Sequence, residues 1–374
     1  MEIKTITCHD VYNYGASLQA YALQRHLENL GHHVEIIDYL PDYLNRRYHF
    51  LSVSPNSKLY RLAKIFYPIS PIIGIWQNRR ELKFWKRKKR FDEFKKNYLK
   101  TTCNTYRSFD ELQTNKPEAD LYIAGSDQIW NTQYSNGKDP AFYCLFEDDK
   151  RKCISYAASF GTHKIYKGYE EFVKKGLSNF RAISIREQTG VQIAKSLNYN
   201  AQLVIDPVFL LENSDWINFC KFSKIKEKYV LVYDFLHNDS RIKELAVKLA
   251  SKGRFKIYSI NDISSLPYAD KNINDAGPIE FLQYIYNAQI IISTSFHATA
   301  FSVIFEKEFY TFPLIGHSNS SRMKDFLSSL NLNERFISEK LKEDYKPIDY
   351  SQSSLKLRTY IETSKKWLSN NLYK

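Results

Sequence analysis

The segment QIIISTSFHATAFSVIFEK, residues 289–307, joins two apolar runs through a short polar corner. Residues 289–293 have the length and composition of a buried strand, and residues 298–305 are apolar without a helix breaker. Thr294 to His297 therefore form the turn that connects a predicted strand to a predicted helix. The first N–H groups of a helix bind anions, because no helical carbonyl accepts them. Since His297 stands at this corner, the segment predicts an anion site with a proton-transfer group already in place.

The beginning of the chain shows the same kind of alternation. Residues 3–8 form a predicted strand, residues 16–30 have the apolar spacing of a helix that stops at Gly31, and residues 34–39 form a second strand. Strand, glycine-containing turn, helix and strand make a Rossmann-like unit. The turn lacks the sequence GxGxxG, so the dinucleotide-binding fingerprint is absent.

A second alternating series begins at Tyr229, after a charged segment with few turn residues. A chain of 374 residues is too long for one ordinary core. We therefore predict an α/β fold of two Rossmann-like lobes, residues 1–211 and 212–352, that face each other across a cleft. The amphipathic residues 353–374 are expected to form a helix that packs back on the first lobe. The carboxyl ends of parallel strands should line the cleft.

Residues 42–115 interrupt the alternation and are predicted to form a basic helical insert in the first lobe. Much of the net charge of +13 gathers at residues 78–100, after an apolar stretch rich in aromatic residues. In one interpretation the insert packs its apolar side on the lobe and leaves Lys and Arg in solvent. In the other, residues 58–100 contact anionic lipid at a membrane surface. No nucleic-acid recognition motif accompanies the charge, so nucleic-acid binding is not predicted.

The cysteine content and the N-terminus point to the cytoplasm. The five cysteines are odd in number and form no CxxC pair, which argues against a disulfide framework and against a zinc site. The N-terminus has no apolar signal core. The longest uncharged run, residues 65–78, is interrupted by proline and too short to span a bilayer. We expect a cytoplasmic protein, attached at most peripherally to the inner face of the membrane, without a metal.

Two residues are the sharpest candidates for chemistry. His297 is a candidate proton-transfer group, although a histidine in that place can equally cap the helix or lie in the core. Arg186 follows the predicted strand 182–185, where a permanently charged guanidinium suits the binding of carboxylate or phosphate. The alternative for Arg186 is an ordinary salt bridge with Glu187 or Asp206.

Three polar turns are further candidates. Each has an ordinary structural explanation, as a simple turn, an Asx turn, or an N-cap serine beside a solvated arginine. In the functional interpretation the turns line the cleft, and their residues are Asn13, Tyr14 and Gly15, then Ser126, Asp127 and Gln128, and finally Ser321 and Arg322.

Taken together, these segments resemble the polysaccharide pyruvyl transferase family. The matching pieces fall in the expected order: HDVYNYGASLQAY (9–21), IIDY (36–39), GSDQIWN (125–131), SYAASFG (155–161), SIRE (184–187), DPV (206–208) and STSFH (293–297). The resemblance implies a glycosyltransferase-B-like architecture and phosphoenolpyruvate as the donor substrate, with no cofactor. The implied acceptor is a hydroxyl pair on a surface polysaccharide or its lipid-linked precursor. The products are a pyruvate ketal and phosphate.

The resemblance also implies roles for single residues. Arg186 matches the family's donor-binding arginine, and His297 matches its catalytic histidine. Many members have an arginine two residues before the histidine, where this chain has Ser295. Arg322 is the nearest candidate to replace that charge, an inference from its place at a predicted helix start and not from the family. Asp127 is expected to orient or deprotonate the acceptor. The residues expected at the donor are Arg186, Ser295, Phe296, Ser321 and Arg322.

Two other functions are compatible with the sequence. A nucleotide-sugar glycosyltransferase would share the two-lobed fold, but it needs an acidic residue for the ribose that is not evident in the second lobe. A non-catalytic glycan-binding or lipid-surface module is the other alternative, and Ser295 in place of an arginine is its best support.

Overall fold

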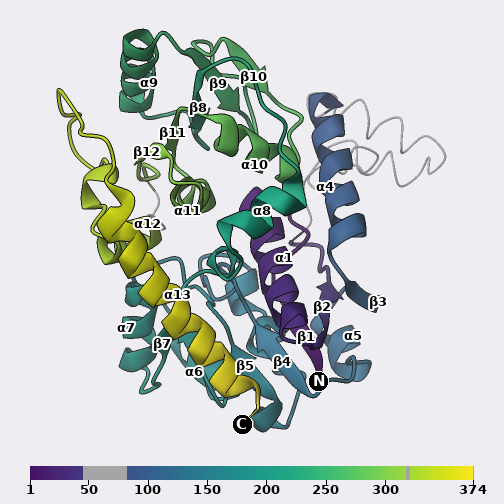
Figure 1. Ribbon diagram of the computed structural model, residues 1–374. Helices are drawn as coiled ribbons and strands as arrows, with labels where there is room; N and C mark the ends of the chain where they lie inside the picture. The colour runs from purple at the N-terminus through teal and green to yellow at the C-terminus, as the bar shows by residue number, and fades with distance from the viewer. Residues whose placement is uncertain (45–81, 317–320, 374) are drawn as a thin grey trace.

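The computed structural model describes residues 1–44, 82–316 and 321–373, which form two lobes (Figure 1). The first lobe is built on a five-stranded parallel sheet of order β3-β2-β1-β4-β5. Bridges from Ile154 to Ala182 and from Ala158 to Ile185 continue this sheet into the short parallel pair β6-β7. The strands are β1 (Glu2–Ile6), β2 (His33–Tyr39), β3 (Thr101–Tyr106), β4 (Leu121–Ala124), β5 (Cys153–Ser155), β6 (Ser184–Ile185) and β7 (Gln202–Leu203).

The second lobe repeats the same strand order in a second five-stranded parallel sheet, β10-β9-β8-β11-β12. In both sheets the first strand in sequence lies in the centre and the chain crosses over to each side in turn, which is the Rossmann pattern. The strands are β8 (Tyr229–Tyr233), β9 (Lys256–Ile260), β10 (Lys271–Ile273), β11 (Ile290–Ser293) and β12 (Glu308–Thr311).

The sequence explains why these strands pair in parallel. Every residue of β4 (LYIA) and of β8 (YVLVY) is buried. Such continuous apolar runs are typical of parallel sheets that helices cover on both faces. The prediction of an α/β fold with two Rossmann-like lobes across a cleft is therefore confirmed.

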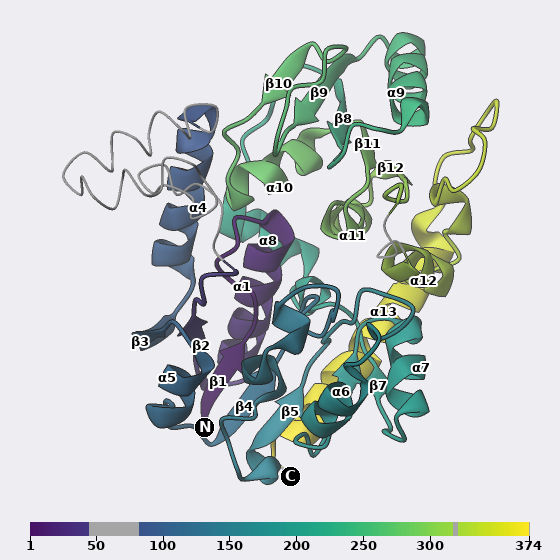
Figure 2. The ribbon, with the colours of Figure 1, turned by 180° about the vertical axis from the view of Figure 1, so that it is seen from behind.

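Helices connect the strands and surround both sheets (Figures 1 and 2). Those of the first lobe are α1 (Tyr14–Asn29), α4 (Trp85–Tyr98), α5 (Phe109–Thr114), α6 (Glu170–Leu177) and α7 (Gln188–Ser196). The chain continues with α8 (Asn213–Cys220), α9 (Ser240–Gly253), α10 (Pro278–Asn287), α11 (Phe296–Ile304), α12 (Ser321–Ser329) and α13 (Tyr350–Leu372).

The prediction that residues 42–115 form an insert is wrong at its C-terminal end. Residues 101–106 are β3, which pairs with β2 at the edge of the first sheet, and α5 follows it. The helix α4 thus belongs to the crossover between two neighbouring strands, β2 and β3. An edge strand has one open side, and three consecutive residues of β3 are exposed, which explains why its polar sequence TTCNTY was not taken for a strand. Residues 45–81 lie outside the described residues.

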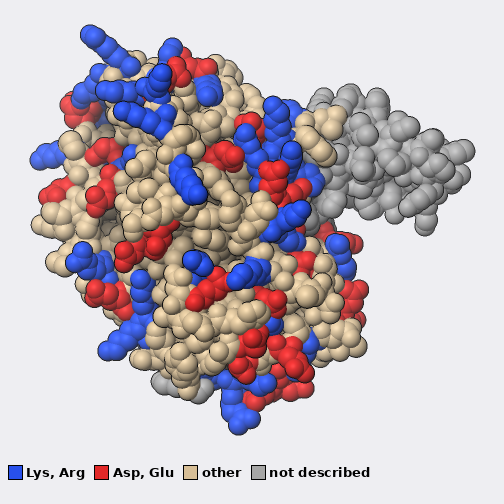
Figure 3. Space-filling view, turned by 45° about the vertical axis from the view of Figure 1, so that its right-hand side comes forward, with Lys and Arg blue, Asp and Glu red and all other residues tan. Residues whose placement is uncertain are grey.

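Several basic residues of α4 form ion pairs with acidic residues of the protein. Lys95 Nζ lies 2.9 Å from an Asp10 oxygen and 2.8 Å from an Asp38 oxygen, and Lys88 pairs with Asp92 one turn along the helix. Figure 3 shows Lys and Arg gathered over α4, with Asp and Glu among them. In the described part of the chain, no helix is both long and apolar enough to cross a membrane. Contact of residues 58–100 with a membrane stays a prediction.

The C-terminal helix α13 lies along the first lobe, although it follows the second lobe in sequence (Figures 1 and 2). Leu368 and Leu372 are buried in a cluster with Ile3, Leu23 and Leu27 of the first lobe. The hydroxyl of Ser364 accepts a hydrogen bond of 2.9 Å from the backbone N–H of Ile205. The helix thus connects the end of the chain to the first sheet by apolar packing.

Replacing Leu368 with Ala should test how much this packing stabilises the molecule. The Leu368 side chain is fully buried, so its truncation should lower the free energy of unfolding by about 2–5 kcal/mol. Leu355 lies on the same helix with 67% of its surface exposed, and Leu355→Ala should change the same quantity by less than about 0.5 kcal/mol. Urea unfolding measures both. Equal effects of the two substitutions would contradict this packing.

Candidate functional site

A cavity of about 350 Å³ lies between the lobes, at the carboxyl ends of strands from both sheets. The first lobe contributes Asn13, Asp127, Gln128 and Tyr134. The second lobe contributes Phe235, Leu236, Asp262, Ile263, Thr294, Ser295, Phe296, His297, Leu314, Arg322 and Met323. The cavity therefore brings together most of the residues that the sequence singled out.

His297 lies in the first turn of α11, as the polar corner predicts. The side-chain oxygen of Ser295 caps this helix by accepting a hydrogen bond from the N–H of Ala298. The remaining N–H groups of the first turn have no acceptor within the helix, and the positive end of the helix dipole faces the cavity side. Ser295, which stands where many family members have an arginine, thus supplies the N-cap of α11.

The imidazole of His297 packs against the backbone of Gly15, at the start of α1 in the other lobe. A Cβ atom built on Gly15 would lie 1.9 Å from Nδ1 of His297, which is far inside van der Waals contact. No residue with a side chain fits there unless the ring moves. Gly15 itself does not line the cavity, so its contribution is to admit the histidine of the opposite lobe.

Asp206 stands behind the imidazole. Its Oδ2 atom lies 3.6 Å from Nε2 of His297 and 2.5 Å from Nη1 of Arg186. Burial alone would raise the pKa of this carboxyl, but His297 and then Arg186 outweigh the burial and lower the pKa below its usual value. An ionised carboxylate therefore faces the histidine.

Arg186 lies one layer beneath the cavity. Its side chain is fully buried, and its two terminal nitrogens pair with Asp206 and, at 2.9 Å, with Asp127. Burial would raise the pKa of Asp127, but Arg186, His297 and Arg322 lower it. Arg186 thus fixes two carboxylates, one facing His297 and one lining the cavity. A direct contact between Arg186 and a donor, as the resemblance implies, would require one of these pairs to exchange.

Arg322 reaches the cavity from the first turn of α12. Its Cζ atom lies 5.6 Å from the ring centre of Phe296, and Cζ of Arg186 lies 4.9 Å from the same ring. Burial, and then the nearby charge of Arg186, lower the pKa of Arg322 to about 10. Two buried cations around one aromatic ring repel each other, so an anion in the cavity would stabilise both.

Other predicted residues support the cavity from behind. Tyr14 is buried, stacks on Phe281 of α10 with ring centres 4.3 Å apart, and donates to the carbonyl of Ala276. Ser126 is buried and donates to the carbonyl of Ala157. Asn13 and Gln128 line the cavity as expected. Ser321 begins α12, and residues 317–320 before it lie outside the described residues.

Three acidic residues at or next to the cavity are not among the predicted site residues. Asp206, an expected salt-bridge partner of Arg186 and part of the family segment DPV, is the carboxylate next to His297. Glu187 accepts hydrogen bonds from the N–H groups of Phe160 and Gly161, and burial raises its pKa. Asp262 lines the cavity. Asp262 is the second residue after the parallel strand β9. Ligands bind at the carboxyl ends of such strands, so this position is the signal in the sequence that indicates Asp262.

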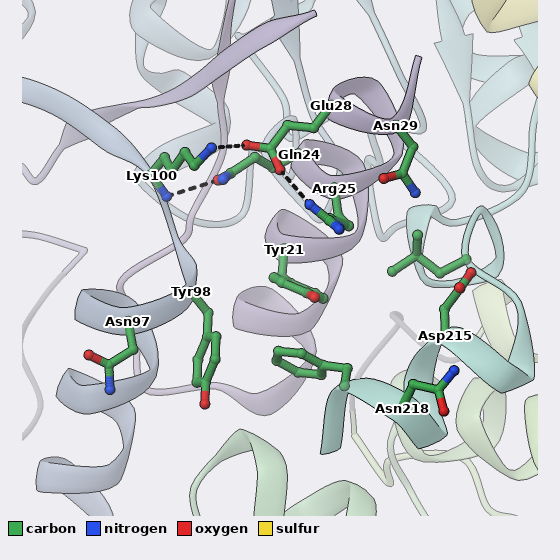
Figure 4. A pocket seen from close by; sticks show the side chains of 12 residues that line it. Tyr21, Gln24, Arg25, Glu28, Asn29, Asn97, Tyr98, Lys100, Asp215 and Asn218 are labelled. Carbon is green, nitrogen blue, oxygen red and sulfur yellow. Dashed lines mark hydrogen bonds and ion pairs between the residues drawn. The ribbon is translucent and has the colours of Figure 1, made fainter. Parts of the chain in front are cut away.

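A second cavity, of about 470 Å³, lies beside α1, between α4 and α8 (Figure 4). Its lining includes Tyr21, Asn97, Tyr98 and Asn218, and none of the predicted site residues. Glu28 within it pairs with Lys100 at 2.7 Å. In the described part of the chain, no group of three or more His, Cys, Asp or Glu side chains is arranged to hold a metal ion.

Residues 13–314 match the sequence model of the polysaccharide pyruvyl transferase family. The chain belongs to this family. The resemblance predicted from the seven sequence segments is confirmed, and the protein is a member of a family of transferases that modify polysaccharides. No curated protein sequence matches the chain.

Several solved structures are similar to this family member at low sequence identity. An uncharacterised protein from Klebsiella pneumoniae has 13% identity and a TM-score of 0.38, over 69% of this chain and 86% of its own. UDP-GlcNAc 2-epimerase from Methanocaldococcus jannaschii has 12% sequence identity and a TM-score of 0.45, and the match covers 97% of this chain and 92% of the epimerase. The glycosyltransferase SsfS6 from Streptomyces sp. SF2575 has 11% sequence identity and a TM-score of 0.39, and the match covers 100% of this chain and 96% of SsfS6. Likenesses at this level do not bear on substrate or reaction.

The contact between Gly15 and His297 can be tested without a substrate. Gly15→Ala should lower the free energy of unfolding by about 1–3 kcal/mol, because the added methyl group overlaps the imidazole. In a His297→Ala background the ring is gone. The same substitution should then be neutral or stabilise by up to about 1 kcal/mol, since alanine favours helix more than glycine. Urea unfolding of the four proteins measures the coupling, and an equal loss in both backgrounds would contradict the contact.

Proposed function

We propose that this protein transfers a pyruvyl group from phosphoenolpyruvate to a hydroxyl pair of a polysaccharide, or of its lipid-linked precursor, with release of phosphate. One observation carries the proposal. The cavity combines His297, backed by the Asp206 carboxylate, with the Arg322 guanidinium and the N-terminus of α11. A histidine for proton transfer next to cationic groups for a small, highly charged acid is the combination that this reaction needs.

The donor would bind at the second-lobe side of the cavity. Arg322, the Ser295 hydroxyl and the first N–H groups of α11 offer donors to its phosphate and carboxylate. The ring of Phe296 packs against the guanidiniums of both Arg186 and Arg322. In this arrangement Arg186 acts by holding Asp127 and Asp206, and Arg322 supplies the charge that Ser295 lacks.

The reaction would proceed by proton transfer and two attacks on one carbon. Protonated His297 gives its proton to the methylene carbon of phosphoenolpyruvate, which makes the neighbouring carbon an electrophile. One sugar hydroxyl, oriented by Asp127, attacks that carbon. The carbon–oxygen bond to phosphate then breaks, and the second hydroxyl closes the ketal ring. Of the two hydroxyl protons released, one restores His297 and the other leaves with phosphate.

Two other functions are outcomes of the same test. A nucleotide-sugar glycosyltransferase of this fold would bind a nucleotide sugar in place of phosphoenolpyruvate. A glycan-binding module would bind a glycan without turning over either donor. Thermal shift with phosphoenolpyruvate, and separately with UDP-, GDP- and dTDP-sugars, distinguishes the three, because only the true donor raises the melting temperature.

His297→Ala should abolish phosphate release from phosphoenolpyruvate in the presence of a glycan acceptor. The loss should reach at least about 100-fold in kcat, the usual contribution of a general acid. His163→Ala is the matched control, because His163 is exposed and lies outside the cavity, and it should leave the rate unchanged. Full activity of the His297 variant would remove this residue from the mechanism.

Arg322→Ala should weaken the binding of phosphoenolpyruvate by about tenfold or more, since a charge-assisted contact in a buried site is lost. Lys324 lies on the same helix but is exposed, so Lys324→Ala should leave the affinity unchanged. Isothermal titration calorimetry with phosphoenolpyruvate alone measures both. An unchanged Kd in the Arg322 variant would mean that another group holds the donor.

A further inference from the structure

Each carboxylate that lines the cavity has a buried arginine behind it. Among the described lining residues, the carboxylates are Asp127 of the first lobe and Asp262 of the second. Arg186 stands behind Asp127, and Arg87 stands behind Asp262 with its Nη2 atom 2.8 Å from Oδ1. Both arginine side chains are fully buried. The two carboxylates that face the cavity are therefore each paired with an arginine that does not line it.

Asp262 is held in a fixed position. The hydroxyl of Tyr233 donates a hydrogen bond of 3.0 Å to Oδ2, while Arg87 pairs with Oδ1. The carboxylate is itself mostly buried, yet it lines the cavity. Oδ1 is buried against Arg87. Because a carboxylate oxygen can accept two hydrogen bonds, Oδ2 keeps capacity for a ligand beside the bond from Tyr233.

Arg87 comes from α4, in the basic segment that the proposed mechanism does not use. Its guanidinium lies 4.3 Å from the ring centre of Tyr14 and 5.0 Å from that of Phe91, and it donates to the Tyr14 hydroxyl and to the backbone carbonyl of Tyr12. The arginine thus crosses from the first lobe to a carboxylate of the second. A buried ion pair of this kind is weak evidence for stability, because desolvation offsets its attraction. A role at the cavity explains why the pair is placed there.

We propose that Asp262 binds one hydroxyl of the acceptor's hydroxyl pair, across the cavity from Asp127, and that Arg87 is the residue that positions Asp262. This inference rests on the proposed function. A neutral diol offers two O–H donors, which two carboxylates on opposite walls can accept. An anionic donor in the same cavity would be repelled by a bare carboxylate, and the buried arginines remove that repulsion. The arrangement suits a neutral acceptor beside a highly charged donor.

The first experiment uses Asp262→Asn, with Asp275→Asn as the matched control. Asp275 also belongs to the second lobe and also pairs with an arginine of α4, Arg90, but it does not line the cavity. The probes are phosphoenolpyruvate, followed by calorimetry, and methyl hexopyranosides of gluco, galacto and manno configuration. Saturation-transfer NMR follows binding of the glycosides to the protein saturated with phosphoenolpyruvate.

Asp262→Asn should keep the Kd for phosphoenolpyruvate within about threefold of wild type and weaken binding of the favoured glycoside by about tenfold or more. Asp275→Asn should change neither. Equal glycoside binding by wild type and Asp262→Asn would overturn the inference, as would a wild-type protein that binds phosphoenolpyruvate but no glycoside. A wild-type protein that does not bind phosphoenolpyruvate would instead overturn the proposed function.

The second experiment tests the role of Arg87 by charge balance. Arg87→Met should weaken phosphoenolpyruvate binding by about tenfold or more, because Asp262 then repels the donor, and Arg87→Met combined with Asp262→Asn should restore the affinity. Arg90→Met, on the same helix, should have no effect. A purely structural role of Arg87 predicts no rescue, and that result would contradict the positioning role. If Arg87→Met does not fold, Tyr233→Phe tests the same placement, since it should weaken glycoside binding alone.

Discussion

The packing of His297 against Gly15 is the contact on which the site depends. It joins the first turn of a second-lobe helix to the first turn of a first-lobe helix, and it leaves no space for a Cβ atom. The two lobes must therefore stand at one separation for the imidazole to reach its place. The neighbouring contacts hold that separation, since Tyr14 stacks on Phe281 and Arg87 reaches Asp262 from α4.

Charge balance is the second constraint. The site gathers Arg186, Arg322 and His297 with Asp127 and Asp206 in a small, mostly buried volume. Arg186 is shared by two carboxylates, and Asp206 is shared by Arg186 and His297. Arg322 faces the cavity beside the N-terminus of α11, where burial and the charge of Arg186 lower its pKa and disfavour its charged form. A multiply charged acid in the cavity would relieve that cost, which is the physical reason for proposing an anionic donor.

Much of this could be predicted from the sequence, because the informative features are local. The strand–helix corner at residues 289–307, the continuous apolar strands and the ordered family segments each lie within a few residues. The contacts that define the site are not local. Nothing within the sequence around Gly15 indicates that a histidine from far along the chain lies on it. The pairing of Arg87 with Asp262 joins a segment that looked like a solvated basic helix to a loop of the other lobe. The strand β3 was missed because an edge strand needs few apolar residues.

In the proposed reaction, C2 of phosphoenolpyruvate becomes the ketal carbon of a glycan. The most direct test is to incubate the protein with phosphoenolpyruvate labelled with carbon-13 at C2 and with a polysaccharide acceptor, and to follow the label by NMR. We expect the label to move from the enol carbon to a ketal carbon attached to the glycan as phosphate accumulates, and His297→Ala to stop both changes. Label that stays in phosphoenolpyruvate, or that appears only as free pyruvate, would contradict the proposed reaction.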